Sequence, residues 1–122
     1  MITWTQVTTL ALRLPGVELS TSYRRPSVKV RKKMFACCGK QDDHFVLLLS
    51  IDEKHALLEN HPTMFFQTPH YEKSGAVLVG YETADQDLVE VLLQRAWQQR
   101  ASTAQRAQFE LDLRRRVGCP RD

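Results

Sequence analysis

The spacing of apolar residues changes between helical and strand-like along the chain, and this order predicts the fold class. Residues 4–14 follow helical spacing behind a Thr3 cap, and Pro15-Gly16 ends that helix. Val28 and Val30 then alternate with polar residues, which is typical of a half-buried strand, and residues 34–38 are its expected hairpin partner. Residues 44–51 are apolar at both parities, which predicts a central strand covered on both faces.

The second half of the chain is expected to add helices on both sides of another hairpin. A short helix should follow Asp52, and strands are expected at 64–68 and 76–81. Thr83 and Gln86 have capping-box spacing and predict the start of a helix, and a last helix is expected from Thr103 to Val117. This order predicts an α+β fold of two layers, an antiparallel sheet of about five strands packed against helices.

The same patterns predict one hydrophobic core. Its expected members are the apolar residues at compatible strand parities and helix faces. They are Trp4, Val7, Leu10, Leu14, Val28, Val30, Phe45, Leu47, Leu49, Val77, Val79, Leu88, Leu92 and Ala96.

Composition fits a single globular domain and favours the cytoplasm. The chain has 122 residues, of which 43% are hydrophobic and 25% are charged. No apolar run approaches the roughly 20 residues of a membrane span, and no export signal is visible at Met1. Three cysteines, an odd number, favour a reducing compartment over a disulfide framework. We expect a cytoplasmic protein with no membrane partner.

The net charge of +3 conceals a segregated distribution. Residues 19–41 contain seven basic residues and no acidic one, whereas residues 42–112 contain twelve acidic and five basic residues. Lys29 and Arg31 share a parity with Ser27, opposite Val28 and Val30, so all three are expected on the solvent face, with Lys32 and Lys33 at the hairpin tip. A basic hairpin of this kind predicts a surface for anions.

A cationic two-stranded ribbon has a shape that reaches phosphates in a nucleic-acid groove. The expected phosphate contacts are the basic residues before and within this hairpin, namely Arg24, Arg25, Lys29, Arg31, Lys32 and Lys33. The alternative is an exposed hairpin whose lysines block edge-to-edge pairing. Lys54, Lys73 and Arg95 lie elsewhere on the chain. Their replacement would be the control for replacement of the hairpin cations in a test of DNA binding.

The remaining reactive residue types do not form a recognisable catalytic or metal site. Cys37 and Cys38 are adjacent on a predicted strand and should point to opposite faces, so they cannot easily share a metal. The four histidines match no metal-ligand spacing, and no phosphate-binding glycine loop or nucleophile elbow occurs. We therefore expect no enzyme activity, no cofactor and no bound metal. The polar loop that contains His70 and Tyr71 is a second candidate site, for a small molecule.

Five short motifs follow one another along the chain, namely Leu14-Pro15-Gly16-Val17, Tyr23-Arg24-Arg25-Pro26, Lys33-Met34-Phe35, Thr68-Pro69-His70-Tyr71 and Ala96-Trp97. In this order they resemble the MmcQ/YjbR family. The resemblance implies a single α+β domain over residues 1–101, similar to the frataxin-like CyaY arrangement and described as a double-wing DNA-binding motif. Residues 102–122 would then be a C-terminal helical extension with a basic tail. Arg24 and Lys32 stand where the family commonly has glycine, which implies backbone with φ > 0 at these positions.

Three functions remain open from the sequence. A non-enzymatic module that binds DNA, or another nucleic acid, with little sequence preference is the first, because the basic hairpin and the family resemblance agree. A protein-interaction or chaperone-like module would instead offer an open sheet face or edge to a partner chain. A small-molecule binder would use the loop of His70 and Tyr71.

Overall fold

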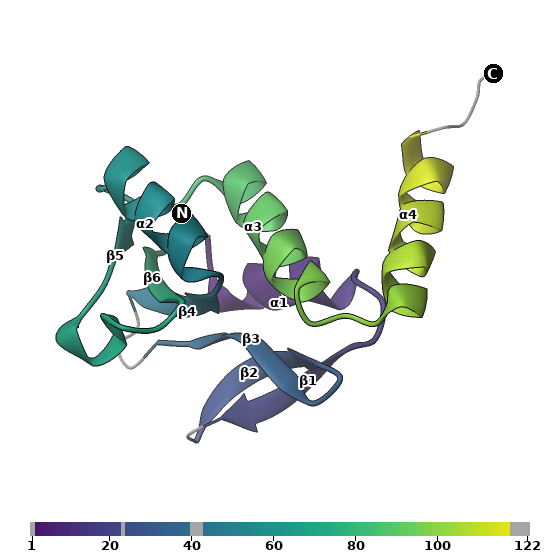
Figure 1. The fold of residues 1–122 in the computed structure, drawn as a ribbon, viewed down its shortest axis with the longest axis horizontal. Coiled ribbons are helices and arrows are strands. Elements are labelled where there is room, and N and C mark those ends of the chain that lie inside the picture. Colours follow the sequence, from purple (N-terminus) through teal and green to yellow (C-terminus); the bar gives the residue numbers. More distant parts are fainter. Residues whose placement is uncertain (1, 23, 40–42, 118–122) are drawn as a thin grey trace.

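A computed structural model describes residues 2–22, 24–39 and 43–117 of the chain (Figure 1). The described elements are, in order, α1 (Trp4–Leu12), β1 (Val17–Ser22), β2 (Arg25–Val30), β3 (Lys33–Cys38), β4 (His44–Leu48), α2 (Ile51–Asn60), β5 (Phe65–Phe66), the short 3₁₀ helix η1 (Pro69–Tyr71), β6 (Ala76–Gly80), α3 (Gln86–Gln98) and α4 (Thr103–Val117).

The six described strands form one sheet in the order β1-β2-β3-β4-β6-β5, and every neighbouring pair is antiparallel. The predicted α+β fold is confirmed, with β1 as an additional strand. β1 was missed because only Val17 and Leu19 are apolar among its residues, and Leu19 stays 61% exposed at the sheet edge. Pairing with β2, rather than burial, makes this segment a strand.

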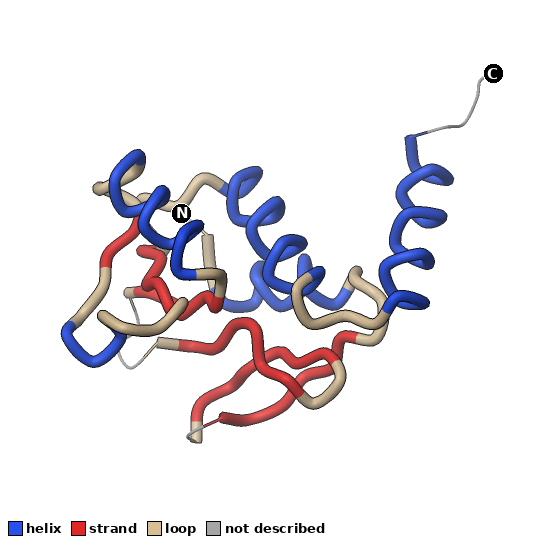
Figure 2. Tube along the Cα trace, viewed as in Figure 1, coloured by secondary structure: helices blue, strands red, loops and turns tan. Residues whose placement is uncertain are grey.

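Helices α1 and α3 pack against each other and against one face of the sheet (Figures 1 and 2). The predicted core is confirmed: all its members join one cluster, although Trp4 and Leu88 are only partly buried. Trp97 of α3 is fully buried in this cluster, and its indole N–H donates to the carbonyl of Pro15 at 2.9 Å. This bond ties α3 to the turn between α1 and β1.

A β-bulge in β3 allows the hairpin to place two successive side chains in the hydrophobic core. Val28 pairs with Ala36 and Lys29 pairs with Met34, so Phe35 has no partner on β2. Phe35 and Ala36 are consecutive, yet both are fully buried in the main core. The bulge therefore overrides strict alternation and turns two successive side chains inward.

Two helices begin at a different residue from the one that the sequence predicted. Ser50 caps α2, because its hydroxyl accepts a bond from the Glu53 amide at 3.2 Å, and Asp52 lies inside the helix. Asp85 caps α3 by accepting from the Asp87 amide at 3.0 Å, so the predicted cap at Thr83 is wrong. Several residue types that favour capping follow one another at both helix starts, so the sequence alone does not single out the cap. The Thr3 capping box is confirmed.

The last helix, α4, has the predicted bounds and leaves the body of the molecule (Figure 1). Phe109 is buried against Trp97, with ring centroids 5.2 Å apart, whereas Leu111 and Leu113 are exposed. None of the helices in the described part of the chain is long and apolar enough to span a bilayer.

Candidate nucleic-acid interface and neighbouring cavity

Strands β1, β2 and β3 form a ribbon whose two turns lie at opposite ends of β2. Ser22 pairs with Arg25 at one end and Val30 with Lys33 at the other, so each turn has two residues. Because β2 has six residues, the turns are separated by about 20 Å. The structure therefore does not gather the predicted cations at one tip. Arg24 and Arg25 mark the first end of the ribbon, and residues 31–33 mark the second end (Figure 1).

Three of the predicted cations have a backbone conformation that L-residues rarely adopt. The φ angles are 65° at Arg24, 53° at Arg31 and 64° at Lys32, and these are the positive-φ residues other than glycine in the described part of the chain. Arg31 and Lys32 are the two central residues of the turn between β2 and β3. Positive φ at both central positions is the signature of a type I′ hairpin turn, which usually contains Asn or Gly. Arg24 and Lys32, which stand where the family commonly has glycine, therefore keep the positive φ that glycine would adopt. All three side chains are exposed.

The middle of the ribbon is less cationic than the sequence indicated. Lys29 is half-buried and pairs across the strands with Glu18, a carboxylate just outside the basic segment. Ser27, expected on the solvent face with Lys29 and Arg31, is only 1% exposed, so that expectation is wrong. A second apolar cluster on this sheet face explains it, because Ser27 pairs with Cys37, which belongs to that cluster. Arg31 has left the strand and lies in the turn.

Lys54 is fully buried and cannot serve as a control cation. Its ammonium group donates to the carbonyl oxygens of Tyr71 at 2.5 Å, Ser74 at 2.8 Å and Glu72 at 3.5 Å. Burial lowers the pKa of Lys54, and the nearby Glu72 carboxylate partly opposes this. Sequence reasoning missed this role, since a single lysine in a polar helix carries no signal of burial.

The loop of His70 and Tyr71 is held to the body by Lys54 and by its own packing. Tyr71 is half-buried and packs against the second apolar cluster, which contains Cys37, Val46, Ala76 and Leu78. The adjacent hollow of about 230 Å³ is lined by Gln67, Thr68, Pro69 and Glu72, without Tyr71. The His70 side chain lies outside the described part of the structure. The arrangement gives Tyr71 a packing role.

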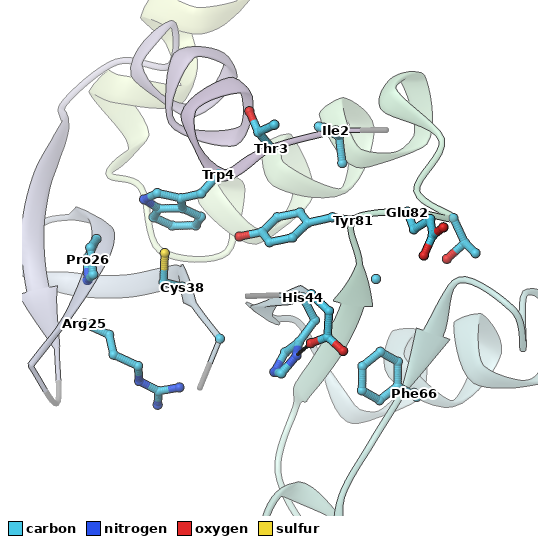
Figure 3. A pocket seen from close by; sticks show the side chains of 14 residues that line it. Ile2, Thr3, Trp4, Arg25, Pro26, Cys38, His44, Phe66, Tyr81 and Glu82 are labelled. Atoms are coloured by element: carbon cyan, nitrogen blue, oxygen red, sulfur yellow. Dashed lines mark hydrogen bonds and ion pairs between the residues drawn. The ribbon is translucent and has the colours of Figure 1, made fainter. Parts of the chain in front are cut away.

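A larger cavity, of about 720 Å³, lies beside the first end of the ribbon (Figure 3). Its walls come from the starts of α1, β2 and β4, the ends of β3, β5 and β6, and the segment after β6. Four of its lining side chains carry aromatic rings, namely Trp4, His44, Phe66 and Tyr81. Three more are charged, namely Arg25, Asp43 and Glu82. Sequence reasoning missed this site because Trp4 was assigned wholly to the core and the others come from separate elements.

The floor of this cavity contains a paired histidine. His44 is 7% exposed, and its Nδ1 lies 2.7 Å from an Asp43 carboxylate oxygen. This hydrogen bond lowers the pKa of Asp43. The ring meets Phe66 edge to face at 5.5 Å. A Cβ at Gly39 would approach the same ring to 2.5 Å, so the cavity needs glycine there.

The adjacent cysteines lie in different surroundings, as their strand positions predicted. Cys37 is buried in the second apolar cluster, whereas Cys38 is half-exposed and lines the cavity. Burial raises the pKa of the Cys37 thiol, with Arg25 acting weakly in the opposite direction. Within the described ranges, no three His, Cys, Asp or Glu side chains are grouped so that they could hold a metal ion.

Comparison with known proteins identifies the family but no activity. The crystal structure of Deinococcus radiodurans protein DR2400, a DUF419 domain, has a TM-score of 0.70 at 19% identity, over 90% of this chain and 89% of that chain. This likeness shows a shared fold. No match is found among curated proteins. The model of the YjbR family matches residues 12–99, from the end of α1 through α3, and the chain therefore belongs to the YjbR family.

Proposed function

We propose that the protein is a non-enzymatic nucleic-acid-binding module that contacts DNA phosphates through the β1–β2–β3 ribbon. The observation that carries the proposal is the placement of Arg24, Arg31 and Lys32 at positive φ. An L-residue in this conformation costs about 1–2 kcal/mol, and glycine or asparagine would relieve most of that cost. Strained residues of this kind concentrate at functional sites. Cations at three such positions are explained by a need for charge at the turns.

The separation of the two turns suggests how the ribbon would lie on DNA. Successive phosphates on one strand advance by roughly 3.4 Å along the duplex axis, so about 20 Å corresponds to about six steps. Each end of the ribbon would then contact about two phosphates, while Lys29 is partly offset by Glu18. Four contacts correspond to a log–log salt slope near −3.6 and to non-specific affinity around micromolar or weaker.

The test measures binding of a fluorescent 12-base-pair duplex of mixed sequence by anisotropy, across a series of salt concentrations. Replacement of Arg31, Lys32 and Lys33 by Gln should reduce the magnitude of the slope by about two units. The pair Arg24→Gln and Arg25→Gln should give a similar reduction from the other end. Glutamine retains the strained backbone, so the fold should be unchanged, which circular dichroism would verify.

The matched control removes three charges elsewhere. Lys73, Arg95 and Arg114 are exposed on the loop before β6, on α3 and near the end of α4. Their triple replacement by Gln changes the net charge as much as the 31–33 triple variant does. If the two triple variants lost equal affinity, or if the unmodified protein showed no salt-sensitive binding, the ribbon would not be the interface. Salt-insensitive capture of a partner protein would then favour the interaction module.

A further inference from the structure

We propose that the cavity beside Arg25 binds one unpaired nucleotide whose base carries an exocyclic amine. The nucleotide could be free or belong to a single strand. This inference deepens the proposed function and rests on it for the strand-bound form. It identifies the part of a nucleic acid that the first end of the ribbon receives.

Opposite charges lie on opposite sides of the cavity. Figure 3 shows Arg25 on one side and Glu82 on the other, with Trp4, Tyr81 and His44 between them. Arg25 adjoins Arg24 at the ribbon turn, so this side continues the cationic surface. A guanidinium group binds phosphate, and a carboxylate accepts from an exocyclic amine such as cytosine N4. A nucleotide carries both groups at opposite ends of one molecule.

The rings between these charges suit a planar base. Trp4 is partly exposed, and Phe66 is 39% exposed, which is unusual for a phenylalanine beside a core strand. Tyr81 stacks on Phe45 with one face, at a centroid distance of 5.7 Å, and so is fixed in place. Bases stack on aromatic side chains with little dependence on sequence. Aromatic walls with few polar groups are typical of small-ligand sites.

The size of the cavity favours an unpaired base. A volume of about 720 Å³ falls within the range of ligand pockets, which is roughly 300–1,000 Å³. A base within a duplex is stacked on both faces and would have to be extruded, at a cost in free energy. A single strand or a free nucleotide avoids this cost. Single strands should therefore bind more tightly than a duplex of the same length.

Trp4 provides a built-in reporter. It lines the cavity, whereas Trp97, the other tryptophan, is fully buried. Titration with dCMP, a dC12 strand and a dT12 strand at pH 7.5 should quench tryptophan fluorescence, and Trp4→Phe should remove the response. We expect dC12 to bind about tenfold more tightly than dT12, because thymine has a carbonyl oxygen where cytosine has the amine.

Two variants test the cavity without altering the ribbon. Glu82→Ala should reduce the preference for dC12 to about twofold or less, since the amine then loses the carboxylate opposite Arg25. Its control, Glu110→Ala on α4, removes the same charge from an exposed position and should retain the preference. Phe66→Ala should weaken both strands about tenfold by removing a stacking surface, whereas Val91→Ala, at 43% exposure on α3, should not.

The outcomes separate this inference from the proposed function. If duplex and single strands bound equally and Trp4 were not quenched, the ribbon function would stand and the cavity inference would fail. If dCMP quenched Trp4 but no strand bound with salt sensitivity, the proposed function would fail and the nucleotide site would stand. Equal quenching by dCMP and by free phenylalanine, a zwitterion with an aromatic ring, would overturn the nucleotide assignment. Retention of the tenfold preference in Glu82→Ala would also overturn it.

Discussion

The two halves of the sheet differ in how they are covered. In β4 and β6, nearly every residue is buried, because α2 and α3 cover one face and the loop of η1 packs on the other. In the ribbon half, β1 exposes Leu19 and Glu18, and the described turn residues Arg24, Arg31 and Lys32 are exposed. The covered half depends on internal pairing of polar groups such as Lys54, whereas the exposed turn side chains Arg24, Arg31 and Lys32 are left to water or to a ligand.

Lysines at the two locations show what this difference means. Lys54 is fully buried and donates to three loop carbonyls, so its charge holds the covered half together. Lys32 is exposed, has φ at 64° and has no structural reason to be a lysine. The same residue type is therefore structural in one half and suited to binding in the other. Substitutions should separate stability from binding along this boundary.

The largest expected effect is in the covered half. Lys54→Met keeps the length of the side chain but removes the ammonium donor from the carbonyls of Glu72 and Ser74 and one of three donors from that of Tyr71. Buried acceptors that lose a partner are costly, so the free energy of unfolding should fall by about 3 kcal/mol. Urea denaturation measures this change. Lys73→Met, on the exposed part of the same loop, should change it by less than about 0.5 kcal/mol, and equal losses would refute the structural role of Lys54.

A smaller effect is expected in the thiol reactivity of the adjacent residues Cys37 and Cys38 on β3. In a Cys119→Ser background, the half-exposed Cys38 should react with a thiol reagent at pH 8 about tenfold faster than the buried Cys37. Burial raises the pKa of Cys37, so less thiolate is present at that pH. Single Cys37→Ser and Cys38→Ser variants assign the two rates. Faster reaction of Cys37 would mean that the loop of η1 does not cover this face.

Hydrophobic spacing predicted most of the fold because most elements have one clear apolar face. Residues 103–117 form a helix with the predicted bounds, and the core members on β4, β6 and α3 were identified from parity and helical spacing. β1 could not be found in this way, since hydrogen bonding to β2 rather than apolar alternation defines it. The bulge at Phe35 also escaped, because its inward turn depends on the partner strand.

The candidate site was only partly accessible to sequence reasoning. The cations of the ribbon were identified, but a charge map along the chain cannot show that Arg24 and Lys32 lie at opposite ends of β2. Glu18 was excluded by a segment boundary, although pairing brings it opposite Lys29. The cavity draws its side chains from distant segments, including Trp4, His44 and Tyr81. Only the tertiary structure brings these residues together.

The smallest expected effect is in the ribbon and tests why its turn carries charge. Arg31 and Lys32 occupy the turn with φ at 53° and 64°, so Arg31→Asn with Lys32→Gly should relieve backbone strain. Glycine also gives the unfolded chain more freedom, which offsets part of the gain. The net increase in the free energy of unfolding should be about 1 kcal/mol, or about 4 °C in Tm.

Nucleic-acid binding should change in the opposite direction, because the double variant loses two cations and with them about two units of salt slope. Arg31→Gln with Lys32→Gln is the matched control: it removes the same charges but keeps side chains that disfavour positive φ. This control should lose the same salt slope without the gain in stability. Equal stabilisation of both variants would attribute the gain to relief of charge repulsion. Stabilisation with unchanged binding would mean that the strained turn is not retained for phosphate contact.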